Sequence, residues 1–289
     1  MKITQFRPYF IDQVAPFFDK EEAESFFYLI IENFRNLKRV DLVMQPDLFF
    51  SEPELIQLEQ VIAELKLQKP IQYILGTTEF YGLQFQVNPH TLIPRPETEE
   101  LVEWILNYQN AINENKKKEG FQSKILDIGT GSGCIAISLA KNFPNAQVDA
   151  IDVSVEALAT AKKNAVLNEV NVQFLHQNIL ETRSLATTYD IIVSNPPYVR
   201  MLEKQEIKTN VLDFEPHLAL FVEDNDALLF YRKIAQLAQH YLNENGLLFF
   251  EINQYLAKET IELLENLHFK SIELRQDIYG NDRMICCKK

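Results

Sequence analysis

The tetrapeptide Asn195-Pro196-Pro197-Tyr198 carries the most specific chemistry in this chain of 289 residues. It directly follows the run 189–194, which is short, apolar and rich in β-branched residues and therefore predicts a buried strand. Two prolines cannot continue the hydrogen-bond ladder of a sheet, so the strand must end there. Ligands bind at the carboxyl ends of strands in open α/β sheets, and we expect a binding site at this turn.

This turn is suited to hold a planar –NH2 group. The Asn195 side-chain oxygen accepts one N–H and the Pro196 carbonyl accepts the other, while proline brings no competing donor. Tyr198 can stack on the flat target, and Pro197 keeps the turn stiff. A strand-ending turn with a cap-like asparagine and packed prolines would explain the same four residues without a ligand, so the choice depends on a second motif.

A glycine-rich turn provides that motif, between an apolar strand and an apolar helix. Gly129, Gly131 and Gly133 are spaced G-x-G-x-G, which lets backbone approach a ligand and point N–H groups at it. The dinucleotide fingerprint is G-x-G-x-x-G, and Cys134 occupies its last position, which weakens the case for NAD. Asp127 at the strand end disfavours a phosphate anion but suits an ammonium cation.

A carboxylate ends the next predicted strand, 147–153. Asp152 follows Gly133 by 19 residues (152 − 133), close to the roughly 20 expected for a ribose-binding carboxylate. A nucleoside that lacks phosphates but carries an amino-acid cation fits these features, and S-adenosylmethionine is such a molecule. The structural alternative is that Asp127 and Asp152 only cap helices or form turns.

With both motifs in place, the chain resembles the class I S-adenosylmethionine-dependent methyltransferases. More narrowly, it resembles the peptide chain release factor glutamine methyltransferases, the PrmC/HemK family. The matching segments are 70–76, 92–99, 126–140, 193–199, 214–216 and 230–232. The run Pro-Arg-Pro-Glu-Thr-Glu at 94–99 together with Asn-Pro-Pro-Tyr is more specific than either alone. The resemblance extends from about Gln72 to the C-terminus, and the first seventy or so positions match only in helical character.

The resemblance implies a Rossmann-like α/β fold with a mostly parallel seven-stranded sheet and a small N-terminal helical domain. It also implies methyl transfer from S-adenosylmethionine to the side-chain amide nitrogen of the glutamine in a release factor's Gly-Gly-Gln motif. The family usually has an acidic residue where adenine is contacted after the third strand. Here Asn178 stands at that position, and its side chain can still bond the adenine edge.

The site residues follow from both motifs and the resemblance. For the donor we expect Asp127, Gly129, Thr130, Gly131, Gly133, Asp152, Asn178 and Asn195. For the acceptor we expect Asn195, Pro196, Pro197, Tyr198 and Arg95, with Asn195, Pro196 and Tyr198 closest to the reaction. A glutamine amide nitrogen is a poor nucleophile, so two oxygen acceptors would aim it and stabilise its developing positive charge. Arg95 and Glu97 either organise the site or form a salt-bridged turn, and the sequence leaves both open.

Three domains are predicted from the pattern of elements. They are a helical substrate-docking domain at 1–71, an extended connection and helix at 72–110, and a catalytic domain at 111–289. Helical spacing is found at 5–14, 20–34, 54–67 and 98–108, and extended segments at 72–87 turn at Tyr81-Gly82. Parallel strands are predicted at 124–129, 147–153, 172–178, 190–194 and 246–252, followed by an antiparallel edge pair at 271–277 and 283–288.

Charge separates the candidate substrates. The chain has 28 Lys and Arg against 41 Asp and Glu, a net charge of −13, whereas a duplex-binding enzyme needs a basic footprint. The run Lys116-Lys117-Lys118 is more typical of a solvated linker. We therefore expect no duplex DNA binding, although an adenine or guanine amino-methyltransferase shares the –NH2 geometry and stays open as an alternative. A non-catalytic module is disfavoured by the intact motifs.

Location and metal content are also addressed by the sequence. No signal region or membrane-length apolar run is present, so we expect a cytoplasmic protein without membrane partners. The three cysteines lack metal-ligand spacing, and we expect no metal site.

Overall fold

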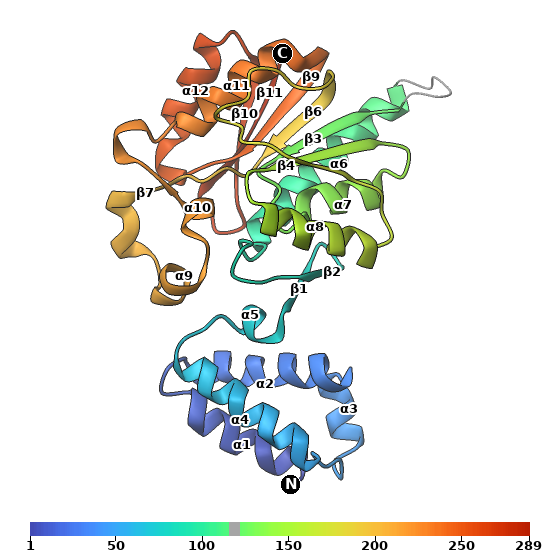
Figure 1. Cartoon of the computed structure of the whole chain (residues 1–289), viewed down its shortest axis with the longest axis vertical. Helices are drawn as coiled ribbons and strands as arrows, with labels where there is room; N and C mark the ends of the chain where they lie inside the picture. The colour runs from blue at the N-terminus through green and yellow to red at the C-terminus, as the bar shows by residue number, and fades with distance from the viewer. Residues whose placement is uncertain (116–121) are drawn as a thin grey trace. The chain divides into compact units, whose positions relative to one another are not determined.

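The computed structural model describes residues 1–115 and 122–289, together with the side chains of all these residues except 109–115 (Figure 1). The predicted linker around Lys116-Lys117-Lys118 lies outside the described residues. The described chain divides into two compact units. One unit comprises Met1–Gly76 and Lys208–Phe214, and the other comprises Thr77–Ile207 and Glu215–Lys289.

The first unit is helical, as predicted for the N-terminal part. Its elements are α1 (Ile3–Val14), α2 (Lys20–Arg35), α3 (Arg39–Met44), α4 (Glu52–Lys66), α5 (Ile71–Leu75) and, later in the chain, α9 (Thr209–Phe214). The apolar stripe of α2 is buried in this unit at Phe26, Phe27, Ile30 and Ile31. The Phe27 ring packs on Phe10 of α1 with ring centroids 5.7 Å apart, which joins the two helices in one core.

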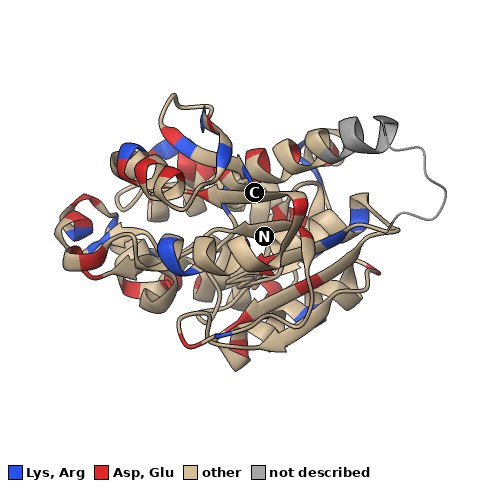
Figure 2. Cartoon of the chain, turned by 90° about the horizontal axis from the view of Figure 1, so that it is seen from above, with Lys and Arg blue, Asp and Glu red and all other residues tan. Residues whose placement is uncertain are grey.

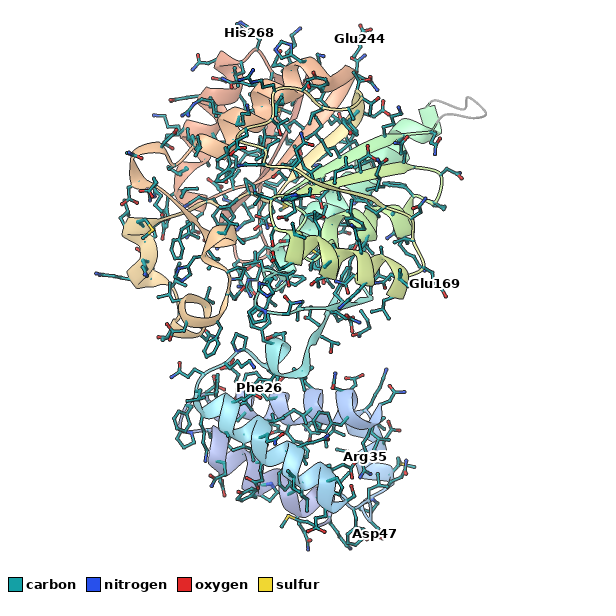
Figure 3. All side chains as sticks on the ribbon, viewed as in Figure 1. Phe26, Arg35, Asp47, Glu169, Glu244 and His268 are labelled. Carbon is teal, nitrogen blue, oxygen red and sulfur yellow. The ribbon has the colours of Figure 1, made fainter. Side chains whose placement is uncertain are left out.

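Local capping explains where these helices begin. Asp19 accepts the Glu22 N–H at 2.7 Å before α2, and the Ser51 N–H donates to Glu54 at 2.7 Å before α4, where the two residues form a capping box. Arg35, labelled in Figure 3 near the end of α2, also donates to both oxygens of Glu54 at 2.6 Å. This ion pair lowers the pKa of Glu54 to about 2 and ties α2 to α4.

The connection between the two units differs in part from the prediction. Residues 71–75 form the helix α5 rather than an extended segment, because five residues are too short to display a helical pattern. Pro70 precedes this helix and Gly76 ends it with a left-handed φ of 72°. The hairpin of β1 (Thr77–Phe80) and β2 (Leu83–Gln86) follows, and its turn lies at Tyr81-Gly82 as predicted.

The second unit contains a seven-stranded sheet in the order β10-β11-β9-β6-β3-β4-β5. Its strands are β3 (Lys124–Ile128), β4 (Gln147–Asp152), β5 (Gln173–His176), β6 (Tyr189–Ser194), β9 (Leu242–Glu251), β10 (Lys270–Gln276) and β11 (Asp282–Lys288). The pairs among β5, β4, β3, β6 and β9 are parallel, whereas β11 is antiparallel to both β9 and β10. The mostly parallel sheet with an antiparallel edge pair is confirmed, and the fold is that of a Rossmann-like class I methyltransferase.

Helices cover both faces of this sheet (Figure 1). They are α6 (Pro96–Asn115), α7 (Cys134–Asn142), α8 (Val155–Leu167), α11 (Leu229–Tyr241) and α12 (Ala257–Asn266). The neighbours Phe249 and Phe250 enter different cores, since Phe249 packs on Trp104 of α6 and Phe250 packs on Tyr231 of α11. Cys286 and Cys287 also belong to opposite cores, as the alternation of a strand requires.

An insertion follows the Asn-Pro-Pro-Tyr turn. The short strands β7 (Val199–Arg200) and β8 (Phe221–Val222) pair in parallel, and between them lie η1 (Met201–Glu206), α9 and α10 (His217–Leu220). The short 3₁₀ turns η2 (Asp224–Asp226) and η3 (Gln254–Leu256) come later. Across 1–115 and 122–289, none of the helices has both the length and the apolar character that a membrane crossing needs.

Candidate active site

A cavity of about 350 Å³ lies at the carboxyl ends of β3, β4, β5 and β6. The predicted site residues that line it are Gly129, Gly131, Asp152, Asn178, Asn195, Pro196 and Pro197. They come from four separate strand ends, which the parallel sheet brings to one edge. The structure thus joins the two sequence motifs in a single cavity.

Two glycines of the loop after β3 present bare backbone to this cavity. Gly129 and Gly131 have φ of 76° and 56°, and a Cβ placed on either would meet nothing within 4 Å. A side chain at either position would therefore extend into the open cradle as well as strain the backbone. Gly133 plays a different part, because a Cβ there would lie 2.8 Å from Ile137 and 3.2 Å from Ala161. It lets α7 and α8 approach and does not line the cavity.

Asp152 forms the turn contacts of the structural alternative and also lines the cavity. Its Oδ2 accepts the Gly131 N–H at 2.8 Å and its Oδ1 accepts the Ser154 N–H at 2.8 Å. These bonds brace the glycine loop and the turn after β4. Each carboxylate oxygen can accept a further hydrogen bond, and the residue lines the cavity. A pair of adjacent ligand hydroxyls is a chemically suitable partner.

Asp127 is fully buried and does not line the cavity. Its Oδ2 accepts the Thr130 hydroxyl at 2.6 Å, while Oδ1 has no well-formed hydrogen bond to a described residue. Burial raises the pKa of Asp127 to about 7, although the Thr130 hydroxyl and the nearby backbone amide of Ala136 favour its charged form. A cation bound at the loop would complete this electrostatic environment.

Asn178 lies in the cavity wall with both ends of its amide engaged. Its oxygen accepts the Leu180 N–H and its nitrogen donates to Glu181, each at 3.0 Å. These bonds shape the turn after β5. Ile179, Leu180 and Phe230 give the same cavity an apolar lining. An aromatic base would find apolar walls and one amide here.

A series of side-chain hydrogen bonds holds the Asn-Pro-Pro-Tyr turn. Asn195 Nδ2 donates to Thr98 Oγ1 at 3.3 Å, and the Thr98 hydroxyl donates to Glu251 Oε2 at 2.6 Å. The Tyr198 hydroxyl donates to the other oxygen of Glu251 at 3.1 Å. Thr98 lies in the first turn of α6 and Glu251 ends β9, so three distant segments meet beside β6.

A second cavity of about 60 Å³ adjoins the first. Asn195, Leu92 and Ala219 line both cavities, whereas Arg95, Tyr198 and Glu251 line only the smaller one. Asn195 therefore lies at the boundary between a large cavity and a smaller one. This position is suited to a group that holds an acceptor next to a bound donor.

Arg95 takes part in a structural ion pair. Its guanidinium donates to Glu215 Oε1 at 2.5 Å, and the other oxygen of Glu215 accepts the Ile93 N–H at 3.2 Å. The partner is thus 120 residues away and is not the neighbouring Glu97. This pair holds the segment before α6 against the residue that follows α9, and Arg95 still lines the smaller cavity.

Burial controls the charges around the smaller cavity. It raises the pKa of Glu251, while Thr98, Tyr198 and the Arg283 cation favour the charged form. Burial also raises the pKa of Tyr198 far above its usual value, so its hydroxyl stays a neutral donor. Within 1–115 and 122–289, no group of His, Cys, Asp and Glu is arranged to hold a metal ion.

Sequence reasoning did not select Thr98, Glu251 or Glu215 as site residues. Thr98 and Glu215 lie in segments that resemble the family pattern, and Glu251 lies within the predicted strand 246–252. What the sequence lacks is the pairing, since these contacts join residues 53 to 153 positions apart. Figure 2 shows Lys and Arg positions interspersed with Asp and Glu positions along the ribbon of the described residues.

Comparisons with known proteins agree across the chain. A model described as PrmC N-terminal domain matches residues 17–76, and one described as Methyltransferase small domain matches residues 110–214. A protein of Flavobacterium psychrophilum named Release factor glutamine methyltransferase is 64% identical over 286 residues, covering 99% of this chain and 98% of the relative. A protein of Bacteroides thetaiotaomicron with the same name is 43% identical over 282 residues, covering 97% and 98%.

A solved structure shares the fold at lower similarity. A T. thermophilus 16S rRNA N2 methyltransferase, solved in complex with AdoMet and guanosine, superposes with a TM-score of 0.50 and 21% identity. The match covers 74% of this chain and 49% of that one. At this identity the likeness establishes only the common architecture.

Proposed function

Because the chain belongs to the release factor glutamine methyltransferase family, we propose that it methylates the Gly-Gly-Gln glutamine of a peptide chain release factor. The methyl group comes from S-adenosylmethionine, the donor of this class of enzyme, and goes to the side-chain amide nitrogen. The observation that carries the proposal is the position of Asn195, which lines both the larger and the smaller cavity.

The residues of the larger cavity fit S-adenosylmethionine. When bound, it supplies a methyl group activated by a positively charged sulfur. Gly129 and Gly131 leave an open cradle, Asp152 offers acceptors for ribose hydroxyls, and the apolar wall near Asn178 suits adenine. The buried carboxyl of Asp127 favours a cationic amino group nearby. Gly133 and Thr130 stabilise the loop without lining the larger cavity. Gly133 packs closely on α7 and α8, and the Thr130 hydroxyl donates to Asp127.

The boundary between the two cavities fits the acceptor amide, because Asn195 lines both cavities and Pro196 lines the larger one. The Asn195 side-chain oxygen and the Pro196 carbonyl would accept the two amide hydrogens, which aims the nitrogen lone pair at the donor. The same oxygens stabilise positive charge as it develops on nitrogen. Tyr198 and Arg95 line the smaller cavity, and Pro197 keeps the turn rigid. A preorganised site of this kind needs no strong base before transfer.

Incubation with labelled S-adenosylmethionine and separate release-factor, DNA and RNA acceptors tests this proposal. We expect label on the release factor alone, and mass spectrometry should find one added methyl on the loop glutamine. A factor with that glutamine changed to alanine is the matched control and should stay unlabelled. Efficient adenine or guanine methylation in nucleic acid, without transfer to release factors, would replace the proposal with the amino-methyltransferase alternative.

The helical unit is proposed to dock the release factor. The short helix α3 and the segment after it expose Val40, Val43, Met44 and Phe49, which are 56% to 76% accessible. Apolar side chains at this exposure are available for a protein partner. Because a release factor acts in translation, we place the reaction in the cytoplasm.

A further inference from the structure

The orientation of the Asn195 amide decides whether this asparagine can hold an –NH2 group. With its oxygen toward the acceptor, Asn195 accepts a hydrogen bond. With the amide rotated by half a turn, an –NH2 group would face another –NH2 group, and two donors cannot bond. The two orientations have nearly the same shape, so packing alone distinguishes them poorly.

The hydrogen-bond partners of Asn195 determine which end of its amide faces the cavity. A carboxylate has no hydrogen to donate, so Glu251 can only accept from Thr98. The single hydrogen of the Thr98 hydroxyl is thereby used at 2.6 Å, which leaves its oxygen to accept. The Asn195 group that faces Thr98, 3.3 Å from the Thr98 oxygen, must then be the –NH2 end. The amide oxygen is left for the cavity side.

We propose that Thr98 and Glu251 are positioning residues that fix the Asn195 amide with its oxygen toward the acceptor. This inference rests on the proposed function, because it explains how the site selects an –NH2 acceptor. Neither residue needs to touch the substrate through this chain of contacts. Each acts through Asn195. Because the Glu251 carboxylate can only accept, it determines which group donates in each hydrogen bond of the series.

The surroundings of Glu251 hold it in place as a hydrogen-bond acceptor for Thr98. It is 2% accessible, and burial raises its pKa, as does Glu97 from α6, while the Arg283 cation from β11 and the two hydroxyl donors Thr98 and Tyr198 favour the charged form. Its backbone carbonyl accepts the Tyr231 hydroxyl at 3.2 Å. The Tyr198 hydroxyl donates to the second oxygen of Glu251, so one buried carboxylate binds both Thr98 and Tyr198, and Tyr198 lines the smaller cavity.

Thr98→Val is the direct test, because it removes the hydroxyl and keeps the shape. Wild-type transfer to a release factor is measured first. We expect the variant to lower kcat about tenfold or more, with the KM for the factor and the donor Kd nearly unchanged. Thr98→Ser restores the hydroxyl and should recover most of kcat. Thr260→Val is the matched control, since Thr260 is fully buried with a hydroxyl bond at 2.7 Å in α12, and it should leave kcat unchanged.

A double variant separates positioning from a merely structural role. If Thr98 acts through Asn195, then Thr98→Val should cost less than about twofold in kcat when added to Asn195→Ala. Glu251→Gln gives a second route that keeps the side-chain shape. A glutamine has one acceptor oxygen for two hydroxyls, so it must disturb Thr98 or Tyr198, and we expect a loss of about tenfold.

The outcomes distinguish this inference from the proposed function. A wild-type kcat in both Thr98→Val and Glu251→Gln, with active wild-type enzyme, would overturn the inference and leave the function intact. Full additivity with Asn195→Ala would also overturn it, because the loss would then not pass through Asn195. An inactive wild-type enzyme on every release factor would reject the proposed function, and the inference with it.

Discussion

The proposed donor half and the proposed acceptor half of the site are built in opposite ways. On the donor side, Asp152 bonds to backbone groups of Gly131 and Ser154, which are 21 and 2 residues away. On the acceptor side, Asn195 depends on Thr98 across 97 residues, and Thr98 depends on Glu251 across 153. One half uses local backbone and the other uses side chains that only the folded sheet brings together.

This difference indicates how each half should fail. Loss of a donor-side group removes a contact to S-adenosylmethionine and should appear mainly as weaker binding. Loss of an acceptor-side group misplaces the amide nitrogen in the transition state and should appear mainly as a lower rate. A donor-side variant that mainly lowers the rate, or an acceptor-side variant that mainly weakens donor binding, would contradict the comparison.

The largest effect is expected from Asn195→Ala. The change removes one acceptor for the target –NH2 group, and methyl transfer should fall about 100-fold or more. The donor Kd, measured by calorimetry, should change less than about twofold. Asn195→Asp keeps an oxygen in place and should retain more activity than alanine. Turnover near the wild-type value in Asn195→Ala would remove the basis for the acceptor half.

Asp152→Ala should show the opposite signature. Loss of a charged hydrogen bond to ribose is expected to weaken donor binding by about 1–3 kcal/mol. The rate at saturating donor should fall much less. Glu156→Ala is a suitable control, because Glu156 is exposed in the first turn of α8 and does not line the cavity. Equal donor affinity in wild type and Asp152→Ala, measured by calorimetry, would contradict the assignment.

Asp127 should make the stability of the free protein depend on pH. Burial raises its pKa from 3.8 to about 7. Between these two pH values the folded protein therefore holds a proton on Asp127 that the unfolded chain has released. The contribution of protonated Asp127 to the free energy of unfolding is fully present below about pH 4 and is lost as the pH rises through about 7. Asp127→Asn should remove roughly 1–3 kcal/mol of this dependence in urea unfolding at pH 5 and pH 8. Parallel pH profiles for both proteins would argue against a buried, raised pKa.

The smallest effect is expected outside both halves. Val43→Asp on α3 should raise the KM for a whole release factor about threefold to tenfold, because it places a charge on the proposed docking surface. Methylation of a short Gly-Gly-Gln peptide should not change. Val166→Asp is the matched control at 79% exposure, compared with 74% for Val43. Equal KM values for the two variants would reject docking through this surface.

Several features could be predicted because their causes are local. The alternation of apolar strands and helices predicted the sheet, and the two prolines after Ser194 marked the end of β6. The helix α5 was missed, because five residues between Pro70 and Gly76 carry no periodic signal.

The sequence by itself determined the types of chemical group and the strand ends that carry them. Glycine spacing predicted a ligand loop, but only the packing of α7 against α8 decided that Gly133 faces a helix while Gly129 and Gly131 face the cavity. The tertiary structure alone decided which distant partners orient Asn195 and Arg95. The physical reason is range, since backbone geometry is set by a few neighbouring residues, whereas a hydrogen bond across 153 residues exists only after the sheet has formed.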